Sequence, residues 1–229
     1  MDAGLSDTSG TWDPIVHEVA GVTRVFIYDR AGLGNSKPSA QPRTSKQMVR
    51  ELHMLLSEAA IGPPYVLVGH SFGGLNMMLY ASRFPHEVVG LVLIDTPHSA
   101  WIDRLEEILS PAQMRAFRAG GVNNREGVSY RRRKLSGRQV QNSPPLPNVP
   151  FIALFAGFEG RPTKWPEGWP TEALDRLLNE LQRDLAAKTP QGRMIVAERS
   201  GHYIHHHEPQ LVVEAIREVI QKARKHDIP

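Results

Sequence analysis

Gly69-His70-Ser71-Phe72-Gly73-Gly74 is the stretch of sequence that decides the fold. It follows an apolar run at 65–68 and precedes a helical pattern at 72–84. A serine between glycines at a strand-to-helix turn fits the G-x-S-x-G pattern, in which a sharp turn exposes the hydroxyl group at the carboxyl end of the strand. Larger side chains two positions away would collide with the adjacent strand and helix. The pattern therefore predicts that Ser71 is a nucleophile.

Apolar runs and helical patterns alternate on both sides of this turn. The runs expected to form strands are 22–28, 65–68, 88–94, 149–155 and 194–196. The patterns expected to form helices are 44–59, 72–84 and 209–224. Continuous apolar strands separated by helices are typical of an α/β fold, in which helices cover both faces of a mostly parallel sheet.

Residues 96–148 interrupt this alternation. They contain helical patterns at 100–109 and after Pro111, and the basic run Arg131-Arg132-Arg133-Lys134. We expect this segment to be a small helical lid inserted over the edge of the sheet. Residues 1–95 and 149–229 then form the core.

Composition narrows the class of protein. A chain of 229 residues is long enough for one domain with a full core. The formal charge of +3 gives no overall signature of binding to nucleic acid, and the absence of cysteine excludes disulfides and thiol chemistry. No basic and apolar leader and no membrane-length apolar run is present, so we expect a cytoplasmic protein without membrane partners, either a monomer or a homodimer.

Four separate segments resemble the α/β-hydrolase family, in particular its serine-esterase branch. Residues 28–36 resemble its D-R-x-G-x-G-x-S loop, and 69–74 match its nucleophile elbow. Residues 91–95 match a strand that ends in an acid, and 200–203 match a G-H segment before the final helix. The resemblance covers nearly the whole chain and implies the fold expected above.

The resemblance also implies a catalytic base and acid. His202 follows a short strand and Gly201, in the chain order serine, acid, histidine that this fold uses. The acid that fixes the imidazole is either Asp95, which ends the strand after the elbow helix, or Glu159, which follows the next strand. We favour Asp95 and keep Glu159 as the alternative.

Two backbone amides are expected to form an oxyanion hole. One belongs to Phe72, directly after the nucleophile, and the other to Leu5 in Ala3-Gly4-Leu5, which resembles the family's oxyanion loop. The family has three strands ahead of this loop that the chain does not contain. The third would lie between the 22–28 strand and the elbow strand, so these two strands are expected either to pair directly or to leave an open edge.

A substrate pocket is expected near the serine. Its candidate lining residues are His70, Trp101, Trp165 and Trp169, although the tryptophans fit packing within the lid equally well. His205-His206-His207 is expected to be a solvated loop without a metal, because no carboxylate completes a ligand set. No metal and no organic cofactor is implied.

These residues favour a carboxylesterase that cleaves small to medium esters through an acyl-enzyme. Other chemistry on the same fold stays open, namely C–C bond hydrolysis, perhydrolysis or amide cleavage. An inactive hydrolase-like binding protein is a further alternative, in which the basic run Arg131-Arg132-Arg133-Lys134 faces an anionic partner. Intact candidates for nucleophile, base and acid favour the enzyme.

Overall fold

The protein is built on one parallel sheet. The computed structural model describes residues 1–119, 125–157 and 165–226. Within them, four strands lie side by side in the order of the chain, and every neighbouring pair is parallel. The strands are β1 (Tyr65–His70), β2 (Val88–Ile94), β3 (Phe151–Ala156) and β4 (Gly192–Ala197). The α/β class expected from the alternating pattern is confirmed.

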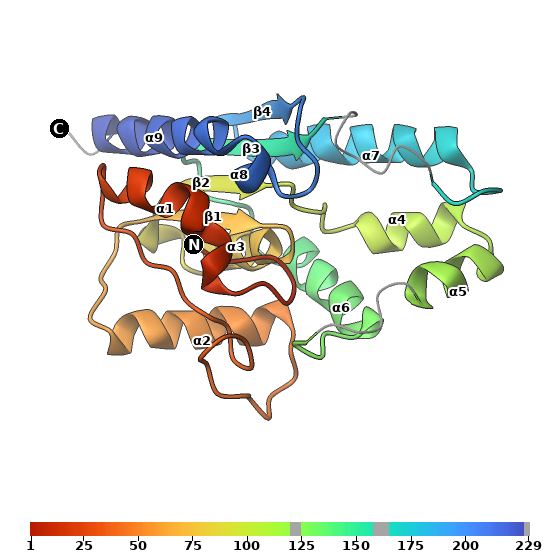
Figure 1. Cartoon of the computed structure of the whole chain (residues 1–229), viewed down its shortest axis with the longest axis horizontal. Coiled ribbons are helices and arrows are strands. Elements are labelled where there is room, and N and C mark those ends of the chain that lie inside the picture. Colours follow the sequence, from red (N-terminus) through yellow and green to blue (C-terminus); the bar gives the residue numbers. More distant parts are fainter. Residues whose placement is uncertain (120–124, 158–164, 227–229) are drawn as a thin grey trace.

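Helices cover both faces of the sheet (Figure 1). One face packs against α2 (Ser45–Glu58) and α3 (Phe72–Arg83) through a cluster that includes Leu67, Leu91 and Phe151. The other face packs against α1 (Asp13–Ala20) and α9 (Pro209–His226) through a cluster that includes Val68, Val92 and Ile152. Successive side chains of a strand point to opposite faces, so each strand needs apolar residues at consecutive positions.

A helical layer lies beyond the carboxyl ends of the strands, at the right of Figure 1. It consists of α4 (Trp101–Ile108), α5 (Pro111–Ala119), α6 (Tyr130–Gln141) and α7 (Thr171–Ala186). Helices α4, α5 and α7 share a separate apolar cluster that includes Leu105, Met114 and Leu177. Residues after β3 thus contribute to the same layer as residues 96–148.

The predicted strand at 22–28 does not form. This segment joins no sheet, and the backbone amides of residues 24–28 find no hydrogen-bond partner in the described parts of the chain. The segment stays close to β1 because the amino group of Met1 donates to the carbonyl oxygen of Phe26 at 2.7 Å. Asp2 pairs with β1 in turn, through bonds to Val68 and His70.

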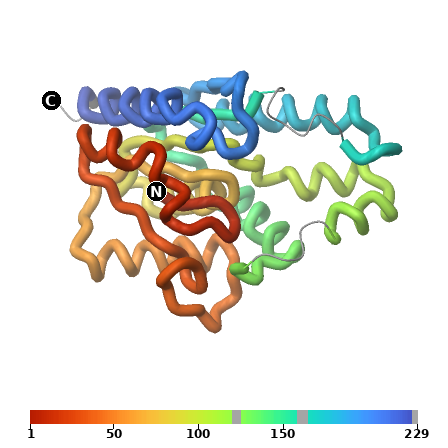
Figure 2. Tube along the Cα trace, viewed as in Figure 1, coloured from red at the N-terminus to blue at the C-terminus, as the bar shows by residue number. Residues whose placement is uncertain are grey.

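Apart from the bonds of Asp2 to Val68 and His70, the edge of β1 that faces this segment has no partner among the described residues. A cavity of about 270 Å³ separates the two, and its lining is mostly apolar and includes Val25, Phe26, Tyr65, Val66 and Met77. We expected segment 22–28 and β1 either to pair directly or to leave an open edge, and the structure has the open edge. The tube in Figure 2 shows the N-terminus beside the sheet and the C-terminus at the far end of α9.

Candidate active site

Ser71 stands at the sharp turn between β1 and α3. Its backbone has φ 51° and ψ −122°, a conformation that is strained for any residue except glycine. The Ser71 amide still donates to the carbonyl oxygen of Ile94 at 2.9 Å, so the turn remains joined to β2. A side chain at Gly69 would lie 2.6 Å from the Cα atom of Gly74, which explains the glycine at that position. The turn therefore presents the serine hydroxyl at the carboxyl edge of the sheet.

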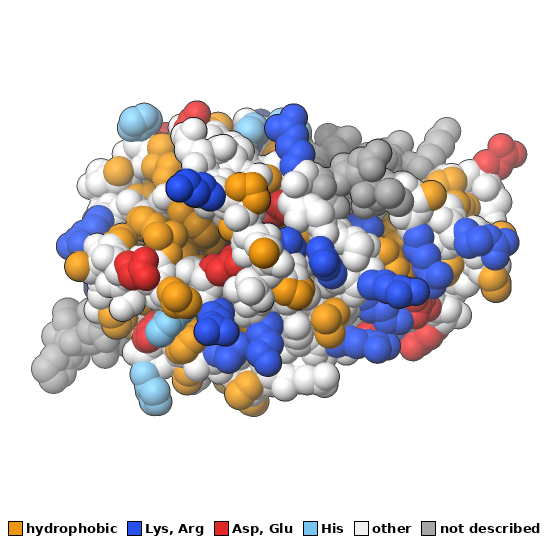
Figure 3. Space-filling model, turned by 90° about the horizontal axis from the view of Figure 1, so that it is seen from below, with side chains coloured by type: hydrophobic (Ala, Val, Ile, Leu, Met, Phe, Trp, Pro, Cys, Tyr) orange, Lys and Arg blue, Asp and Glu red, His pale blue; other side chains and the backbone are white. Residues whose placement is uncertain are grey.

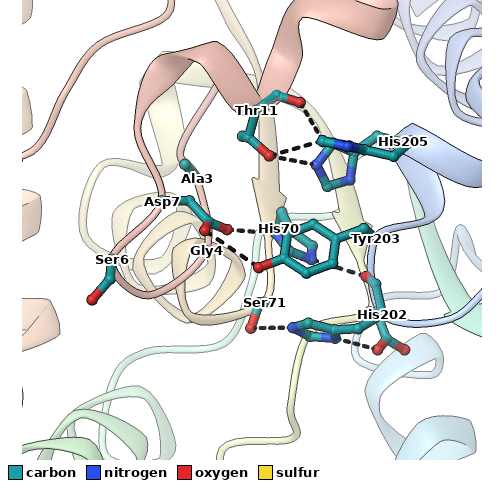
Figure 4. A network of polar contacts seen from close by, with 12 residues as sticks. Ala3, Gly4, Ser6, Asp7, Thr11, His70, Ser71, His202, Tyr203 and His205 are labelled. Atoms are coloured by element: carbon teal, nitrogen blue, oxygen red, sulfur yellow. Dashed lines mark hydrogen bonds and ion pairs between the residues drawn. The ribbon is translucent and has the colours of Figure 1, made fainter. Parts of the chain in front are cut away.

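His202 lies beside this hydroxyl group (Figure 4), and Asp95 contacts the opposite side of the His202 imidazole. Nε2 of His202 is 3.0 Å from Oγ of Ser71, and Nδ1 is 2.6 Å from Oδ2 of Asp95. Asp95 directly follows β2, and its other carboxylate oxygen accepts the amide of Ala156 at 3.0 Å. Three segments that are distant in sequence thus meet because parallel strands end at one edge of the sheet.

These distances are the ones that a proton relay requires. Because an ionised carboxylate accepts hydrogen bonds only, Asp95 favours the imidazole tautomer that carries its proton on Nδ1. Nε2 of His202 then offers its lone pair to the Ser71 hydroxyl. This arrangement can remove the serine proton as the oxygen attacks an electrophile, which is the chemistry of an activated nucleophile.

The structure brings the favoured acid, Asp95, into contact with His202. The alternative acid, Glu159, lies outside the described residues. Asp95 has positive φ, 40°, so the chain turns sharply after β2 and directs the carboxylate toward the histidine.

The loop expected to complete an oxyanion hole lies against the start of α3. Asp2 forms an isolated parallel β-bridge with Gly69. A side chain at Gly73 would overlap the carbonyl oxygens of Asp2 and Ala3. Leu5 follows in a turn that packs against the cluster containing Phe72. The Leu5 amide has no hydrogen-bond partner among the described residues.

A pocket of about 380 Å³ opens in front of Ser71. Of the four residues expected to line it, Trp101 and Trp165 do. Trp169 stacks on Trp165, with ring centroids 6.3 Å apart, and is not among the lining residues. The rest of the wall is mostly apolar and comes from strand ends and from α7, including Thr96, Pro97, Phe155, Leu178 and Leu181.

The expectation that His70 lines the pocket is wrong. Its side chain is 0 % exposed. Nε2 of His70 donates to the carbonyl oxygen of His202 at 3.0 Å, and Nδ1 lies 3.6 Å from Oδ2 of Asp7. Burial lowers the pKa of His70, against the opposing effect of Asp7. His70 therefore supports the backbone of the histidine loop, because alternation along β1 turns its side chain into the molecule.

The three histidines after Ile204 do not form a loop, and of the three only His206 and His207 are exposed. They form the short helix α8 (Ile204–His207), and His205 is fully buried. Nε2 of His205 lies 2.9 Å from Oγ1 of Thr11. Figure 4 shows His205 and Thr11 facing each other. Burial lowers the pKa of His205 to about 2, and the neighbouring histidines add to this effect. His205 is therefore a neutral core residue.

The described residues contain no group of three or more His, Cys, Asp or Glu side chains arranged to hold a metal ion. No helix among them is long and apolar enough to cross a membrane.

The sequence analysis did not predict the polar contacts around the loop 2–7, which involve the partly buried Asp7 and the buried Arg30. Asp7 contacts His70, and Arg30 contacts the carbonyl oxygens of Ala3 and Gly4. Arg30 belongs to the D-R-x-G-x-G-x-S segment at 28–36, so its charge directly after an apolar run was an available signal. No local pattern pointed to Asp7.

The family model "Alpha/beta hydrolase family" matches residues 3–215. The chain is also 31 % identical over 221 residues to the uncharacterized protein YqjL of Bacillus subtilis (strain 168), covering 96 % of this chain and 81 % of the relative. The chain belongs to the α/β hydrolase family.

One curated relative is named a lipase, and one solved structure with the same fold is named an esterase. Lipase LipV of Mycobacterium tuberculosis is 33 % identical over 129 residues, which span 52 % of this chain and 48 % of the lipase. A thermophilic esterase from Thermogutta terrifontis has the same fold, with a TM-score of 0.63 and 19 % identity over 97 % of this chain and 88 % of the esterase. The similarity to the Thermogutta terrifontis esterase concerns the fold alone.

Proposed function

We propose that this α/β hydrolase is a serine hydrolase that cleaves small to medium carboxylic esters through an acyl-enzyme. The observation that carries the proposal is the line of contacts from Ser71 Oγ to His202 Nε2 at 3.0 Å and from His202 Nδ1 to Asp95 Oδ2 at 2.6 Å. The lipase among its relatives supports an ester substrate.

In the acylation step, Ser71 Oγ attacks the ester carbonyl carbon and its proton passes to His202 Nε2. The carbonyl oxygen becomes an oxyanion, for which the amides of Phe72 and Leu5 are the proposed donors. The C–O bond to the alcohol then breaks, and His202 returns the proton to the departing alkoxide. Asp95 stabilises the imidazolium ion that forms between these two transfers.

Water completes the cycle by the same route. His202 removes a proton from water, the hydroxide oxygen attacks the acyl carbon, and the bond to Ser71 Oγ breaks as the serine regains a proton. The His202 side chain is 47 % exposed, so water has access to Nε2. The products are a carboxylic acid and the alcohol, and no cofactor takes part.

The pocket supports the size of the proposed substrate. A volume of about 380 Å³ lined by Trp101, Phe155 and Leu181 accommodates a short apolar acyl or alcohol group. An activity maximum on emulsified long-chain esters would contradict this part of the proposal.

The alternative of a binding protein for an anionic partner is less well supported. Figure 3 shows Lys and Arg side chains gathered toward the end of the molecule that carries the helical layer, with acidic side chains among them. Lys134, from the basic run, pairs with Asp103 and Glu106, and Arg138 also pairs with Asp103. Lys134 is therefore less available to a partner.

Labelling with a fluorophosphonate tests whether Ser71 is activated, without requiring the right ester. We expect one adduct, mapped to Ser71 by peptide mass spectrometry, and none in Ser71→Ala or His202→Ala. A panel of p-nitrophenyl esters of increasing chain length then gives the acyl preference. Folded protein that neither reacts with the reagent nor cleaves any ester would overturn the proposed function.

A further inference from the structure

A buried arginine holds the loop that carries the Leu5 amide. Nη1 of Arg30 donates to the carbonyl oxygen of Ala3, and Nη2 donates to that of Gly4, both at 2.6 Å. The Arg30 side chain is 2 % exposed, so water hardly competes for these bonds. Two consecutive peptide groups are therefore fixed from the same side.

Fixing the Gly4 carbonyl group also fixes the Leu5 amide. The carbonyl of Gly4 and the N–H of Leu5 belong to one planar trans peptide unit, in which they point in opposite directions. The bond from Arg30 therefore directs the Leu5 N–H away from the guanidinium group. A hydrogen bond from a cation to the carbonyl oxygen also polarises that peptide unit, which makes its N–H a stronger donor.

Glu126 holds the same loop on the other side of Leu5. Its carboxylate pairs with Arg30 through two bonds of 2.7 Å, and Oε2 also accepts the amide of Ser6 at 2.9 Å. Ser6 has φ 66°, a conformation that favours glycine and needs support from its surroundings. The peptide groups before and after Leu5 are thus both held by the ion pair.

A second carboxylate completes the network. Asp2 Oδ1 accepts from Arg30 at 2.6 Å, and Asp2 Oδ2 accepts from Asn76 at 2.8 Å. The side chains of Asp2 and Glu126 are both 0 % exposed. Burying charges has a large desolvation cost that their pairing only offsets, so stability alone does not explain this network. Its bonds to the loop backbone indicate a role in positioning.

We propose that Arg30 and Glu126 are positioning residues that direct the Leu5 amide toward the carbonyl oxygen of a substrate at Ser71. The inference rests on the proposed function, because it assigns that amide to the oxyanion hole of the proposed reaction. Glu126 lies within residues 96–148, so the predicted lid segment takes part in setting the geometry of the loop.

Steady-state kinetics of Glu126→Ala test this proposal. We expect kcat on a p-nitrophenyl ester to fall about 10- to 100-fold while KM changes less than about threefold, since the donor acts on the transition state. Glu126→Gln, which keeps an acceptor for the Ser6 amide, should recover part of the rate. An equal kcat in Glu126→Ala and the wild type would overturn the proposal.

The matched control is Glu51→Ala. Glu51 accepts two bonds from Arg43, at 2.9 and 2.7 Å, and contacts no residue of the loop. Glu51→Ala removes the carboxylate that pairs with the largely buried Arg43, just as Glu126→Ala removes one that pairs with Arg30. The control therefore reproduces the loss of stability that follows from breaking a buried ion pair, but it leaves the peptide groups around Leu5 unchanged. We expect its kcat to match that of the wild type, and an equal fall in both variants would show a merely structural effect.

Amide hydrogen exchange, measured by NMR, provides a readout that does not need activity. The amides of Ser6 and Asp7 are bonded to Glu126 and to the Gly4 carbonyl oxygen, and we expect both to exchange at least about tenfold faster in Glu126→Ala. Unchanged exchange would overturn the proposal even if activity fell. A wild type that lacks both adduct and turnover would instead refute the proposed function, and exchange alone would then decide whether Glu126 orders the loop.

Discussion

The Asp95 carboxylate is shared between an imidazole and a backbone amide. Its Oδ2 lies 2.6 Å from Nδ1 of His202, and its Oδ1 accepts the amide of Ala156 at 3.0 Å. Since Ala156 ends β3 and Asp95 follows β2, two neighbouring strands fix the direction of the carboxylate. The imidazole therefore meets an acid that cannot rotate freely, as a relay to Ser71 requires.

This contact predicts the effect of Asp95→Asn. The amide keeps the shape of the side chain, but it no longer favours the tautomer with the proton on Nδ1 of His202. We expect kcat on a p-nitrophenyl ester to fall about 10³- to 10⁴-fold, with little change in KM. Glu159→Gln is the matched control and should stay within about threefold of the wild type. A collapse of the rate in Glu159→Gln alone would identify Glu159 as the acid.

The sequence predicted Ser71 and His202 as partners because each depends on a short local pattern. Gly69-His70-Ser71-Phe72-Gly73 is set by the sterics of one turn, and the structure brings its serine to His202. The acid could not be decided in the same way. Asp95 and Glu159 both follow strands, and only the three-dimensional position of the strand ends determines which carboxylate reaches the imidazole.

The predictions about the fold that proved wrong failed for a different reason. Residues 22–28 have the β-branched and aromatic composition of a strand, but a strand also requires a partner in register, and the described residues supply none. The contacts of Arg30 with Glu126 join residues 96 positions apart, so no local pattern could reveal them. His205 was expected in solvent, and its burial depends on the packing of α8 against Trp12.

The open edge of β1 predicts an alternation in amide exchange. In this parallel strand, the amides of Leu67 and Gly69 face β2, whereas those of Val66 and Val68 face the cavity and have no partner among the described residues. In dilute solution, we expect NMR to show that the amides of Val66 and Val68 exchange at least about tenfold faster than those of Leu67 and Gly69. Equal protection of all four amides would show that another chain or segment covers the edge.

Gly73→Ala is predicted to displace the loop that precedes Leu5. A methyl group at this position would overlap the carbonyl oxygens of Asp2 and Ala3, which are backbone atoms and cannot move alone. We expect the free energy of unfolding to fall by about 1–3 kcal/mol in urea titrations, a typical cost of overpacking a rigid contact. Gly62→Ala is the control, because no atom lies within 4 Å of the added group. An unchanged midpoint in Gly73→Ala would contradict the close approach.

The buried His205 predicts that the protein loses stability in mild acid. Burial lowers its pKa from 6.5 to about 2, and the charges of His70, His206, His202 and His207 act in the same direction. Above pH 6.5 the imidazole is neutral in both states, and it imposes no penalty. Below that pH the unfolded chain binds a proton that the folded state rejects, so the free energy of unfolding falls as the pH falls.

The expected slope is about 1.4 kcal/mol per pH unit below pH 6.5, which gives a loss of about 2 kcal/mol between pH 7 and pH 5. Urea titrations across this range measure the loss. His205→Gln keeps an acceptor near Thr11 but does not titrate. Between pH 7 and pH 5, the free energy of unfolding of this variant should therefore fall by about 2 kcal/mol less than that of the wild type. The exposed His206 serves as the control, since His206→Gln should keep the slope of the wild type. If His205→Gln and the wild type declined in parallel, His205 would be protonated in the folded protein and its burial would not be the source of the acid sensitivity.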